Sequence, residues 1–462
     1  MERMRRLVLC LLFALSAGAL TPEQQQWISK AKRTPRDGWI YLHVEGAPRE
    51  RGFQHGYLLA KEIDDGLRMR RKEWEYFDAM EWSWLTSKAK TLVIPKVDPE
   101  LLAEIDGIAE GMNAAGIAVT REDLVAYNDW FDLEGSWFPT VKKEVGSRAP
   151  ALPKQSCSAF IATGRMTSDG GIVLGHNTWF EFPAATANVM LDMVPAKGHR
   201  FVMQIYPGWV HSGTDWFVTG VGLVGAETTI GNFDGFDEKG IPEFDRMRRA
   251  TQYASTIDEW CAIMRKGNNG GYANAWLIGD VNTNEIARLE LGLKYVGFER
   301  TKDGYFTGSN VAENSKILRF ETDTHETDIR VSGVARRVRW QQLMRENAGR
   351  IDAEKGKAFE ADHYDAYLKK ELPGAHSLCG HFDENPGLQG TATPYSPAGS
   401  FDAKVIDTKM AKRMAFAARW GRACGQPFDA KQFLDEHPQF EWMRDILPSR
   451  PSQPWTEIKA GM

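Results

Sequence analysis

The chain has 462 residues, which is enough for one large domain or for two to three ordinary ones with a substantial core. It is 42% hydrophobic and 26% charged, and its net charge of −5 gives no electrostatic basis for binding nucleic acid or anionic membranes. Sixteen tryptophans stand out from this ordinary composition, and we assign most of them to packing rather than to a ring-lined cleft.

The N-terminus has the pattern of a secretory signal peptide. Three arginines precede the apolar run 7–15, and small residues follow at 17–19. An apolar run of this length is too short to cross about 30 Å of hydrocarbon. We therefore predict a signal peptide over 1–19, export to a secreted, periplasmic or lumenal location, and no integral membrane segment after its removal.

Four cysteines remain after the signal peptide: Cys157, Cys261, Cys379 and Cys424. They form no CxxC pair and have no metal-ligand spacing, so the sequence predicts neither a metal site nor a cofactor. A disulfide between Cys379 and Cys424 is compatible with export, although the pattern leaves the pairing open. Cys261 lies in a helix-like run and is expected to be a buried thiol.

Residues from about 35 to 135 form a mainly helical segment. Asp98 and Pro99 are typical of a helix N-cap and first helical position, with apolar residues on one stripe up to position 112. Thr120 followed by Asp123 repeats this capping pattern. From 138 to 156 the pattern ends in a charged, Pro-containing loop, and loops of this length are often functional or excised.

From Cys157 onward, short β-branched and aromatic runs predict strands. "CSAFIAT" and "GIVLGHNTWF" flank the turn signal "SDGG" and predict a hairpin. Helical patterns return at 244–266 and 334–347, and the chain from about 403 is mixed. Strands in the middle with helices before, between and after them predict an α+β sandwich, with helices outside two packed sheets. The further predicted strands are "ANVMLDMV", "RFVMQIY", "WFVTGVGLVGAETTI", "YANAWLIGD" and "EIARLELG".

Cys157 stands where a polar loop ends and a strand begins. A lone cysteine is usually a small buried hydrophobe, but as a nucleophile it needs a base. If the chain is cut before Cys157, its own α-amine titrates near 7.7 to 8.0 and can accept the thiol proton at neutral pH. The first cut is made by attack of the thiol on the carbonyl of Ser156. Because the α-amine does not exist before this cut, the step requires another base or a water.

The hairpin resembles the opening of N-terminal nucleophile hydrolases, in the branch that contains phospholipase B-like proteins and the isopenicillin N acyltransferase group. Further segments resemble that family in the same order, over most of the mature chain: "ERGFQHG", "GLVGAETTI", "NNGGYANAWLIGD", "GYFTGSNV" and "SFDAKV". The resemblance implies a four-layer αββα sandwich of two antiparallel sheets. It also implies a cut between Ser156 and Cys157, after which 20–156 and 157–462 stay associated as one composite domain.

The resemblance also assigns roles around the thiol. Asn274 falls where the family places an amide that donates to the oxyanion; without the resemblance, a structural role at a strand edge or turn would be the preferred explanation. His176 lies 19 residues after Cys157 on the partner strand. It is a candidate base, substrate contact or α-amine orienter, and equally a structural histidine.

The remaining candidates carry weaker signals. Trp179 is a candidate wall of an acyl pocket, and Thr228 a candidate second hydrogen-bond donor. Some relatives have an arginine in the site, and spacing does not choose among Arg288, Arg300 and Arg319.

The sequence therefore predicts an exported, self-processed hydrolase of acyl esters or amides, including phospholipids as a candidate substrate class. One alternative is a papain-like thiol hydrolase with His376 or His381 as base, but such nucleophiles usually open a helix. Another is a Trp-rich exported protein that binds lipids or glycans without chemistry. No G-x-S-x-G elbow supports a serine triad.

Overall fold

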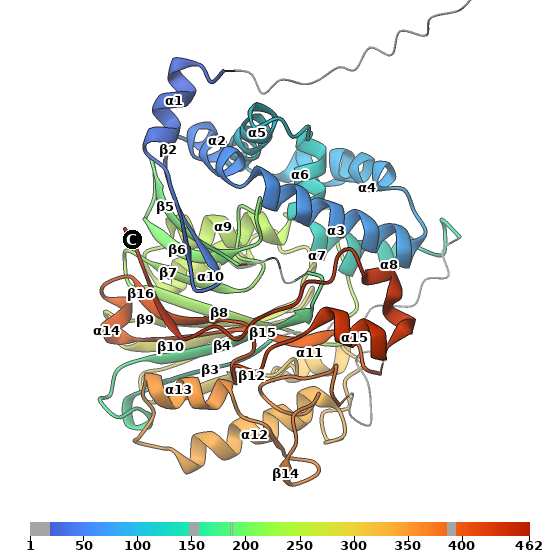
Figure 1. Ribbon diagram of the computed structural model, residues 1–462. Coiled ribbons are helices and arrows are strands. Elements are labelled where there is room, and N and C mark those ends of the chain that lie inside the picture. The colour runs from blue at the N-terminus through green and yellow to red at the C-terminus, as the bar shows by residue number, and fades with distance from the viewer. Residues whose placement is uncertain (1–18, 147–156, 185, 187, 386–393) are drawn as a thin grey trace, which may run out of the picture.

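The computed structural model describes residues 19–146, 157–184, 186, 188–385 and 394–462. Two β-sheets pack face to face at the centre, and helices cover their outer faces (Figure 1). The predicted four-layer α+β sandwich is therefore confirmed. The predicted signal peptide, except for its last residue, and the end of the predicted linker up to Ser156 lie outside the described residues.

The larger sheet has the strand order β1-β2-β5-β6-β7-β8-β9-β10-β11 in the described part of the chain. Neighbouring strands are antiparallel except for the parallel pair β2–β5, which departs from the purely antiparallel sheets that we predicted. Parallel neighbours need a long crossover, and here the connection over 47–188 contains helices α2 to α8 and the β3–β4 hairpin of the smaller sheet. The strands are β1 (Lys32–Arg36), β2 (Trp39–Gly46), β5 (Val189–Pro195), β6 (Phe201–Ile205), β7 (Trp216–Thr219), β8 (Leu223–Thr229), β9 (Asn274–Asp280), β10 (Glu285–Leu291) and β11 (Val296–Thr301).

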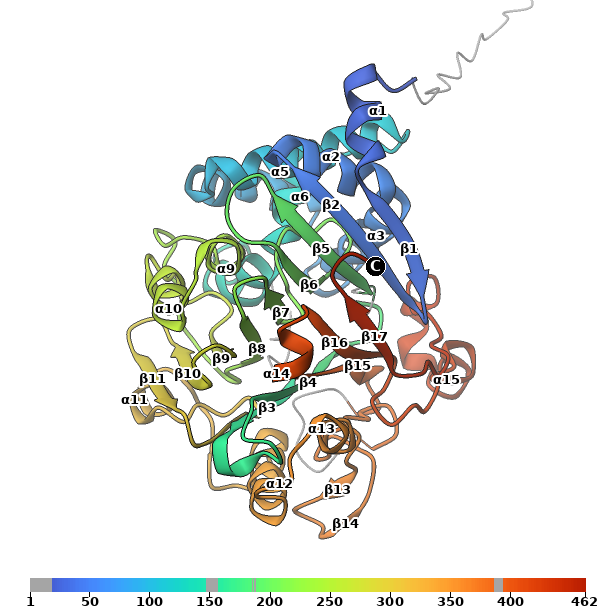
Figure 2. The same ribbon diagram turned by 90° about the vertical axis from the view of Figure 1, so that its left-hand side faces the viewer.

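The smaller sheet has the order β12-β3-β4-β15-β16-β17 and is antiparallel throughout. The predicted hairpin is confirmed as β3 and β4, in register from Ser158 opposite Asn177 to Ala162 opposite Val173. Figure 2 shows the strands of the larger sheet side by side, from β1 at one edge to β11 at the other. The strands are β12 (Gly304–Gly308), β3 (Ser158–Thr163), β4 (Val173–Glu181), β15 (Ala398–Asp407), β16 (Ala415–Trp420) and β17 (Thr456–Lys459); β13 (Tyr364–Asp365) and β14 (Lys370–Glu371) form a separate small pair.

The helices form the two outer layers (Figure 1). Helices α2 to α6 lie on the side of the larger sheet, whose β7, β9 and β10 contact α9 and α10, whereas α12 and α13 cover the smaller sheet. The helices are α1 (Pro22–Ser29), α2 (Pro48–Leu58), α3 (Ala60–Asp78), α4 (Trp82–Lys88), α5 (Pro99–Ala114), α6 (Arg121–Asn128), α7 (Trp130–Asp132), α8 (Phe138–Val141), α9 (Glu243–Tyr253), α10 (Ile257–Arg265), α11 (Ser315–Phe320), α12 (Ser332–Glu346), α13 (Ala353–Glu360), α14 (Thr408–Ala411) and α15 (Ala430–Glu436).

Both predicted helix starts in the N-terminal segment are confirmed. The Asp98 side chain accepts a hydrogen bond from the backbone N–H of Glu100 at the start of α5, and Thr120 forms a capping box with Asp123 at the start of α6. The segment predicted to be mainly helical also contains two strands that were not predicted. The sequence of β1, "KRTPR", lies at a sheet edge and is mostly exposed, so it shows no alternation of apolar residues. The sequence of β2, "WIYLHVEG", is mostly buried or half-buried between β1 and β5.

Helices α2 and α5 pack with their backbones in close contact, and glycines make this possible. A Cβ atom on Gly52 would lie 2.0 Å from the backbone oxygen of Glu104, and one on Gly111 would lie 2.4 Å from that of Phe53. Any larger residue at these positions would push the helices apart. The glycines of the "ERGFQHG" segment therefore serve helix packing.

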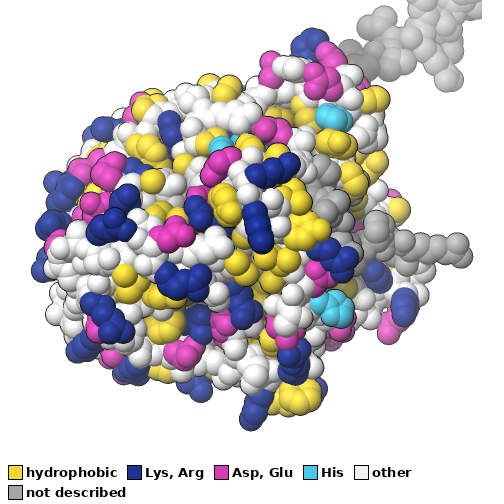
Figure 3. All heavy atoms as spheres, turned by 90° about the horizontal axis from the view of Figure 1, so that it is seen from below, with side chains coloured by type: hydrophobic (Ala, Val, Ile, Leu, Met, Phe, Trp, Pro, Cys, Tyr) yellow, Lys and Arg dark blue, Asp and Glu magenta, His cyan; other side chains and the backbone are white. Residues whose placement is uncertain are grey.

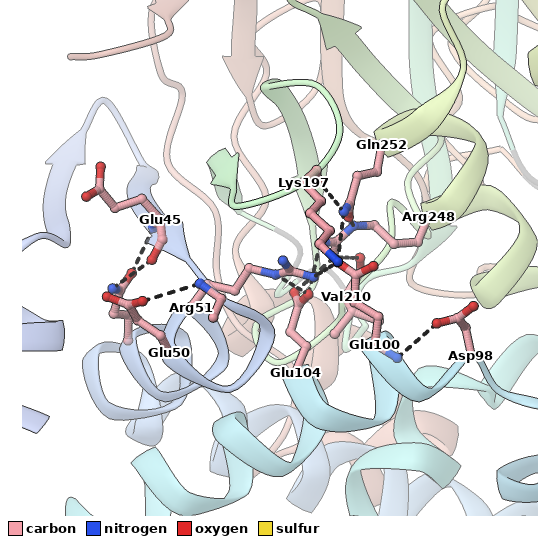
Figure 4. Close-up of polar contacts among 12 residues, drawn as sticks. Glu45, Glu50, Arg51, Asp98, Glu100, Glu104, Lys197, Val210, Arg248 and Gln252 are labelled. Atoms are coloured by element: carbon pink, nitrogen blue, oxygen red, sulfur yellow. Dashed lines mark hydrogen bonds and ion pairs between the residues drawn. The ribbon is translucent and has the colours of Figure 1, made fainter. Parts of the chain in front are cut away.

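A buried ion cluster joins α2, α5 and α9 (Figure 4). Glu104 accepts from Arg51 Nε at 2.6 Å and from Arg248 Nη1 and Nη2 at 2.9 Å each, so both carboxylate oxygens are bonded. Burial opposes the negative charge, but the two guanidinium groups outweigh it and lower the pKa of Glu104 to about 2. This cluster fixes the outer helices to one another.

The surface and core agree with the composition. Lys and Arg side chains are interspersed with Asp and Glu on the face seen from below, as a small net charge leads us to expect (Figure 3). Among the residues that the structure describes, no helix is long and apolar enough to cross a membrane. Tryptophans with fully buried side chains include Trp39, Trp74, Trp179, Trp209, Trp216, Trp260, Trp276 and Trp340.

Candidate active site around Cys157

Cys157 immediately precedes β3 and is buried, with 1% of its surface exposed. Its backbone φ is +75°, in the left-handed region that costs a non-glycine residue roughly 1–2 kcal/mol. Backbone strain of this kind concentrates at functional sites and needs support from its surroundings. The support comes from α12, where Arg336 Nη1 donates a hydrogen bond of 2.8 Å to the Cys157 carbonyl oxygen.

Arg336 is itself buried and held in place by two further groups. Its Nη2 donates to the Asn310 side-chain oxygen at 2.7 Å, and its guanidinium carbon lies 4.2 Å from the ring centroid of Trp179. Burial lowers the pKa of Arg336 to about 9, although the nearby Cys157 opposes this shift, so the group stays protonated at neutral pH. The arginine therefore places a fixed positive charge beside Cys157.

The three arginines considered from the sequence lie elsewhere. Each forms an ion pair at the surface: Arg288 with Glu299, Arg300 with Asp258, and Arg319 with Glu326. The signal for Arg336 was available in the helical pattern, because Arg336, Trp340, Leu343 and Met344 share one buried stripe of α12. An arginine on an apolar stripe indicates a buried partner.

His176 lies beside the thiol, as the hairpin register predicts. The Cys157 sulfur, a ring nitrogen of His176 and a carboxylate oxygen of Asp215 all lie within 4.8 Å of one another. His176 Nε2 is 3.0 Å from the backbone oxygen of Glu227, and because a carbonyl only accepts, Nε2 carries the proton. His176 Nδ1 is then an acceptor, and it has no hydrogen-bond partner among the described residues. Burial and the nearby Lys404 hold the pKa of His176 well below its usual range.

Two acidic residues near the thiol were missed from the sequence. Tyr272 donates to Asp215 Oδ2 at 2.8 Å, and burial raises the pKa of Asp215 to about 7. Burial and the charge of Asp215 raise the pKa of Glu227 well above its usual range, so this pair holds at least one proton at neutral pH. The sequence did carry a signal for Glu227, since it is the one acid within the predicted strand "WFVTGVGLVGAETTI", and all residues of the corresponding β8 are buried.

The thiol of Cys157 is protonated in this environment. Burial raises its pKa well above the ordinary range, and the nearby Asp215 and Glu227 add to the shift. A hydrogen bond with the Trp179 backbone and the charge of Lys404 act in the opposite direction. Lys404 is held by Asp402 at 2.7 Å, within the predicted segment "SFDAKV". Removing the thiol proton therefore requires an adjacent base.

Asn274 is the first residue of β9 and is 1% exposed. Neither its amide nitrogen nor its oxygen has a hydrogen-bond partner in the part of the chain that the structure describes. It stands opposite Thr229 in the sheet, and the Thr229 carbonyl accepts from the Asn310 amide at 2.7 Å. Asn310 also binds Arg336, so a chain of hydrogen bonds links the strand beside Asn274 to Cys157.

Trp179 and Thr228 are placed differently. The Trp179 ring packs against the Arg336 guanidinium, which binds the Cys157 carbonyl, and Trp179 Nε1 donates to the Leu378 carbonyl at 3.1 Å. Thr228 is buried against Gly308, where a Cβ atom would lie 2.3 Å from its hydroxyl oxygen. Gly308 stands opposite Ala159 in the sheet, two residues beyond Cys157. Close packing between the sheets is sufficient to explain Thr228.

The papain-like alternative is wrong. Cys157 opens a strand, and its neighbouring imidazole is His176. His376 instead pairs with Asp365 at 3.1 Å, and His381 lies next to the sulfur atoms of Cys379 and Cys424. These two cysteines are free thiols, so the disulfide considered from the sequence is not present, whereas Cys261 is buried in α10 as expected.

The chain is similar to proteins named phospholipase B. Residues 99–296 match the family model described as Phospholipase B. The chain is 27% identical over 423 residues to a phospholipase B of Crotalus adamanteus, covering 78% of this chain and 74% of the relative. The predicted resemblance to phospholipase B-like proteins is therefore confirmed.

Other relatives are matched over less of their length. An uncharacterized protein of Archaeoglobus fulgidus is 25% identical over 310 residues, which is 60% of this chain and 48% of that protein. Phospholipase B-like protein C of Dictyostelium discoideum is 24% identical over 332 residues, or 62% and 54%. The chain thus spans about half the length of these two relatives. Among solved structures, a mutant of conjugated bile acid hydrolase from Clostridium perfringens aligns with a TM-score of 0.32 and 9% identity, over 57% of this chain and 89% of that one.

Proposed function

We propose that the protein is a phospholipase B-like hydrolase that cleaves acyl esters or amides through a thioester on Cys157. The observation that carries the proposal is the pairing of a buried thiol with a neighbouring neutral imidazole acceptor, His176 Nδ1. The match to the Phospholipase B model and the names of the relatives support acyl chemistry. A noncatalytic lipid-binding or glycan-binding protein would need neither the base nor the backbone strain.

The first step is self-cleavage. His176 Nδ1 takes the thiol proton, and Cys157 Sγ attacks the carbonyl carbon of Ser156. The Ser156–Cys157 peptide bond breaks to a thioester, and the proton passes to the released α-amine. Water then hydrolyses this thioester, which leaves a carboxylate on Ser156 and a free thiol and amine on Cys157.

In the mature enzyme the α-amine of Cys157 is the base. It takes the thiol proton as Sγ attacks the substrate acyl carbon, and it returns that proton to the leaving alcohol or amine. Water hydrolyses the resulting thioester and releases the acid. The partnerless amide of Asn274 donates to the developing oxyanion, while Trp179 lines the acyl pocket.

Packing supports continued association of the two fragments after the cut. Strand β2 of the N-terminal fragment pairs with β5 of the C-terminal one from Ile40 opposite Val189 to Gly46 opposite Pro195. The Arg51–Glu104–Arg248 cluster crosses the same boundary. The predicted N-terminal signal implies an enzyme outside the cytosol, where a small acyl ester or amide, including a phospholipid, is its substrate and nucleic acid is not a partner.

Intact mass spectrometry of the purified protein tests this proposal. We expect two fragments that meet between Ser156 and Cys157 and that elute together in gel filtration. The Cys157→Ala variant should remain one chain and should lose turnover of a chromogenic ester by about 10⁶-fold. The matched variant Cys261→Ala removes a buried thiol from α10 and should be cut and active. A wild-type chain that is active while uncut contradicts the mechanism.

A further inference from the structure

A second group of chemically reactive side chains lies apart from Cys157. His363 directly precedes β13, Cys379 and His381 lie in the loop after β14, and Cys424 follows β16. Their ligand atoms all lie within 4.8 Å of one another. The proposed mechanism uses none of these four residues, which come from three segments of the chain.

Three distances within this group, all to His381 Nε2, match those of a tetrahedral site. His363 Nε2 and His381 Nε2 are 3.2 Å apart, and His381 Nε2 is 3.5 Å from Cys379 Sγ and 3.6 Å from Cys424 Sγ. With zinc bonds of about 2.0–2.1 Å to nitrogen and 2.3 Å to sulfur, tetrahedral angles place two nitrogens about 3.3 Å apart and a nitrogen and a sulfur about 3.6 Å apart. The side chains are therefore already arranged around a central point.

We propose that His363, Cys379, His381 and Cys424 bind a thiophilic divalent cation of the Zn²⁺ type. Two thiolates and two neutral imidazoles balance the charge of the ion, and the two thiol protons are released when it binds. Four protein ligands close the coordination shell, so the ion has a structural role and leaves no open position for a substrate. Cys379 and His381 are buried, while His363 and Cys424 are partly exposed and give the ion a path of entry.

Neighbouring groups orient the ligands in the manner of known metal sites. His381 Nδ1 is 3.0 Å from Glu384 Oε1, and because a carboxylate accepts, Nδ1 carries the proton and Nε2 is left as the ligand atom. Arg422 Nη1 and Gln426 Nε2 hold the same Glu384 oxygen at 3.0 and 2.6 Å. The backbone N–H of Gln426 donates to Cys424 Sγ at 3.4 Å, which favours a thiolate.

The cation also stabilises the wall of the active site. Leu378, next to the ligand Cys379, accepts at its carbonyl from Trp179 Nε1 and Asn177 Nδ2, both at 3.1 Å. Trp179 in turn lies under Arg336, which binds the Cys157 carbonyl. The site therefore anchors the segment that positions Trp179, and this consequence rests on the proposed function, whereas metal binding itself does not.

Metal analysis of the purified full-length protein, after dialysis against metal-free buffer and reloading with Zn²⁺, tests the proposal. We expect about one zinc per chain, and after replacement by Co²⁺ the charge-transfer absorption of a thiolate-bound cobalt. Cys424→Ser and His363→Ala should reduce the retained zinc at least tenfold. Cys261→Ser, a buried thiol in α10, should retain it. Cys157→Ala should also retain it, which separates this site from the group formed by Cys157, His176 and Asp215.

Two outcomes of measurements on the wild-type protein overturn the proposal without any variant. One is a zinc content far below one per chain after reloading. The other is a chain mass lower by two hydrogen atoms with Cys379 and Cys424 in one peptide pair, which identifies a disulfide. Neither depends on cleavage before Cys157, so failure of the metal site and failure of the proposed function are distinguished.

Discussion

Two buried polar regions of this molecule, the ion cluster around Glu104 and the group around Cys157, differ in how their polar atoms are paired. In the first, both carboxylate oxygens of Glu104 receive hydrogen bonds from guanidinium groups, and its pKa is lowered to about 2. In the second, the Asn274 amide and His176 Nδ1 have no partners among the described residues, and the pKa of Asp215 is raised to about 7.

This difference in pairing distinguishes residues that stabilise the fold from residues that are candidates for catalysis. A buried charge with its partners in place contributes to a fixed fold, and removing one partner leaves the other unpaired. A buried polar group without partners destabilises the fold, which is acceptable where a substrate or intermediate later completes its hydrogen bonds. Substitutions in the first region should therefore change stability, and those in the second should change turnover.

The largest stability effect is expected for Glu104→Gln. The substitution leaves Arg248 buried without its counter-charge and Arg51 with Glu100 as its remaining acidic partner, and breaking a buried ion pair typically costs about 3–5 kcal/mol of unfolding free energy. Urea unfolding of the variant and the wild type measures this loss. Glu354→Gln is the matched control, because its pair with Lys357 is exposed and should contribute less than about 1 kcal/mol.

The same cluster sets a pH dependence of stability. The pKa of Glu104 is lower in the folded chain than in the unfolded one, so its contribution is complete above about pH 4.5 and is lost as pH falls towards 2. A shift of this size corresponds to about 3 kcal/mol. Between pH 5 and pH 2 the wild type should lose this amount more than Glu104→Gln does. Equal losses in both chains would assign the acid sensitivity to other carboxylates.

Asn274→Ala should have the opposite signature. Turnover of a chromogenic ester should fall by about 10²- to 10³-fold, because the oxyanion loses a donor. Stability should stay the same or rise, because a buried amide without partners is removed.

Asn128→Ala is the counterpart of this variant. The Asn128 amide donates to Leu124 and Gly208 carbonyls and accepts from the Val210 N–H, so its loss should cost about 1–3 kcal/mol of stability. Turnover of the folded fraction should be unchanged. If Asn274→Ala behaves as Asn128→Ala does, Asn274 is a structural residue and the proposed oxyanion donor is wrong.

The sequence was sufficient for features that depend on local patterns. The capping at Asp98 and Thr120, the hairpin of β3 and β4, and the placement of His176 beside Cys157 all follow from spacing and periodicity. Strands β1 and β2 were both missed: β1 is an exposed edge strand with no apolar face to detect, and β2 lies in the segment predicted to be mainly helical.

Contacts between segments that are distant in the chain could not be predicted from the sequence. Asp215 and Arg336 reach Cys157 from positions 58 and 179 residues further along the chain, and no spacing rule connects them. The four residues of the proposed cation site come from three segments joined only by the fold. Single-sequence reasoning therefore singled out Cys157 and missed many of the residues that surround it in the fold.

The smallest of these effects is expected for Arg336→Lys. A lysine keeps the positive charge but has one ammonium group in place of the guanidinium that bonds both the Cys157 carbonyl and Asn310. Losing one of these hydrogen bonds should loosen the strained backbone at Cys157 and lower kcat about tenfold, with KM unchanged, since about 1.4 kcal/mol is a factor of ten. Arg319→Lys alters an exposed pair and should leave both constants as they are. An equal change in KM would instead assign Arg336 to substrate binding, and a loss confined to thermal stability would assign it to packing alone.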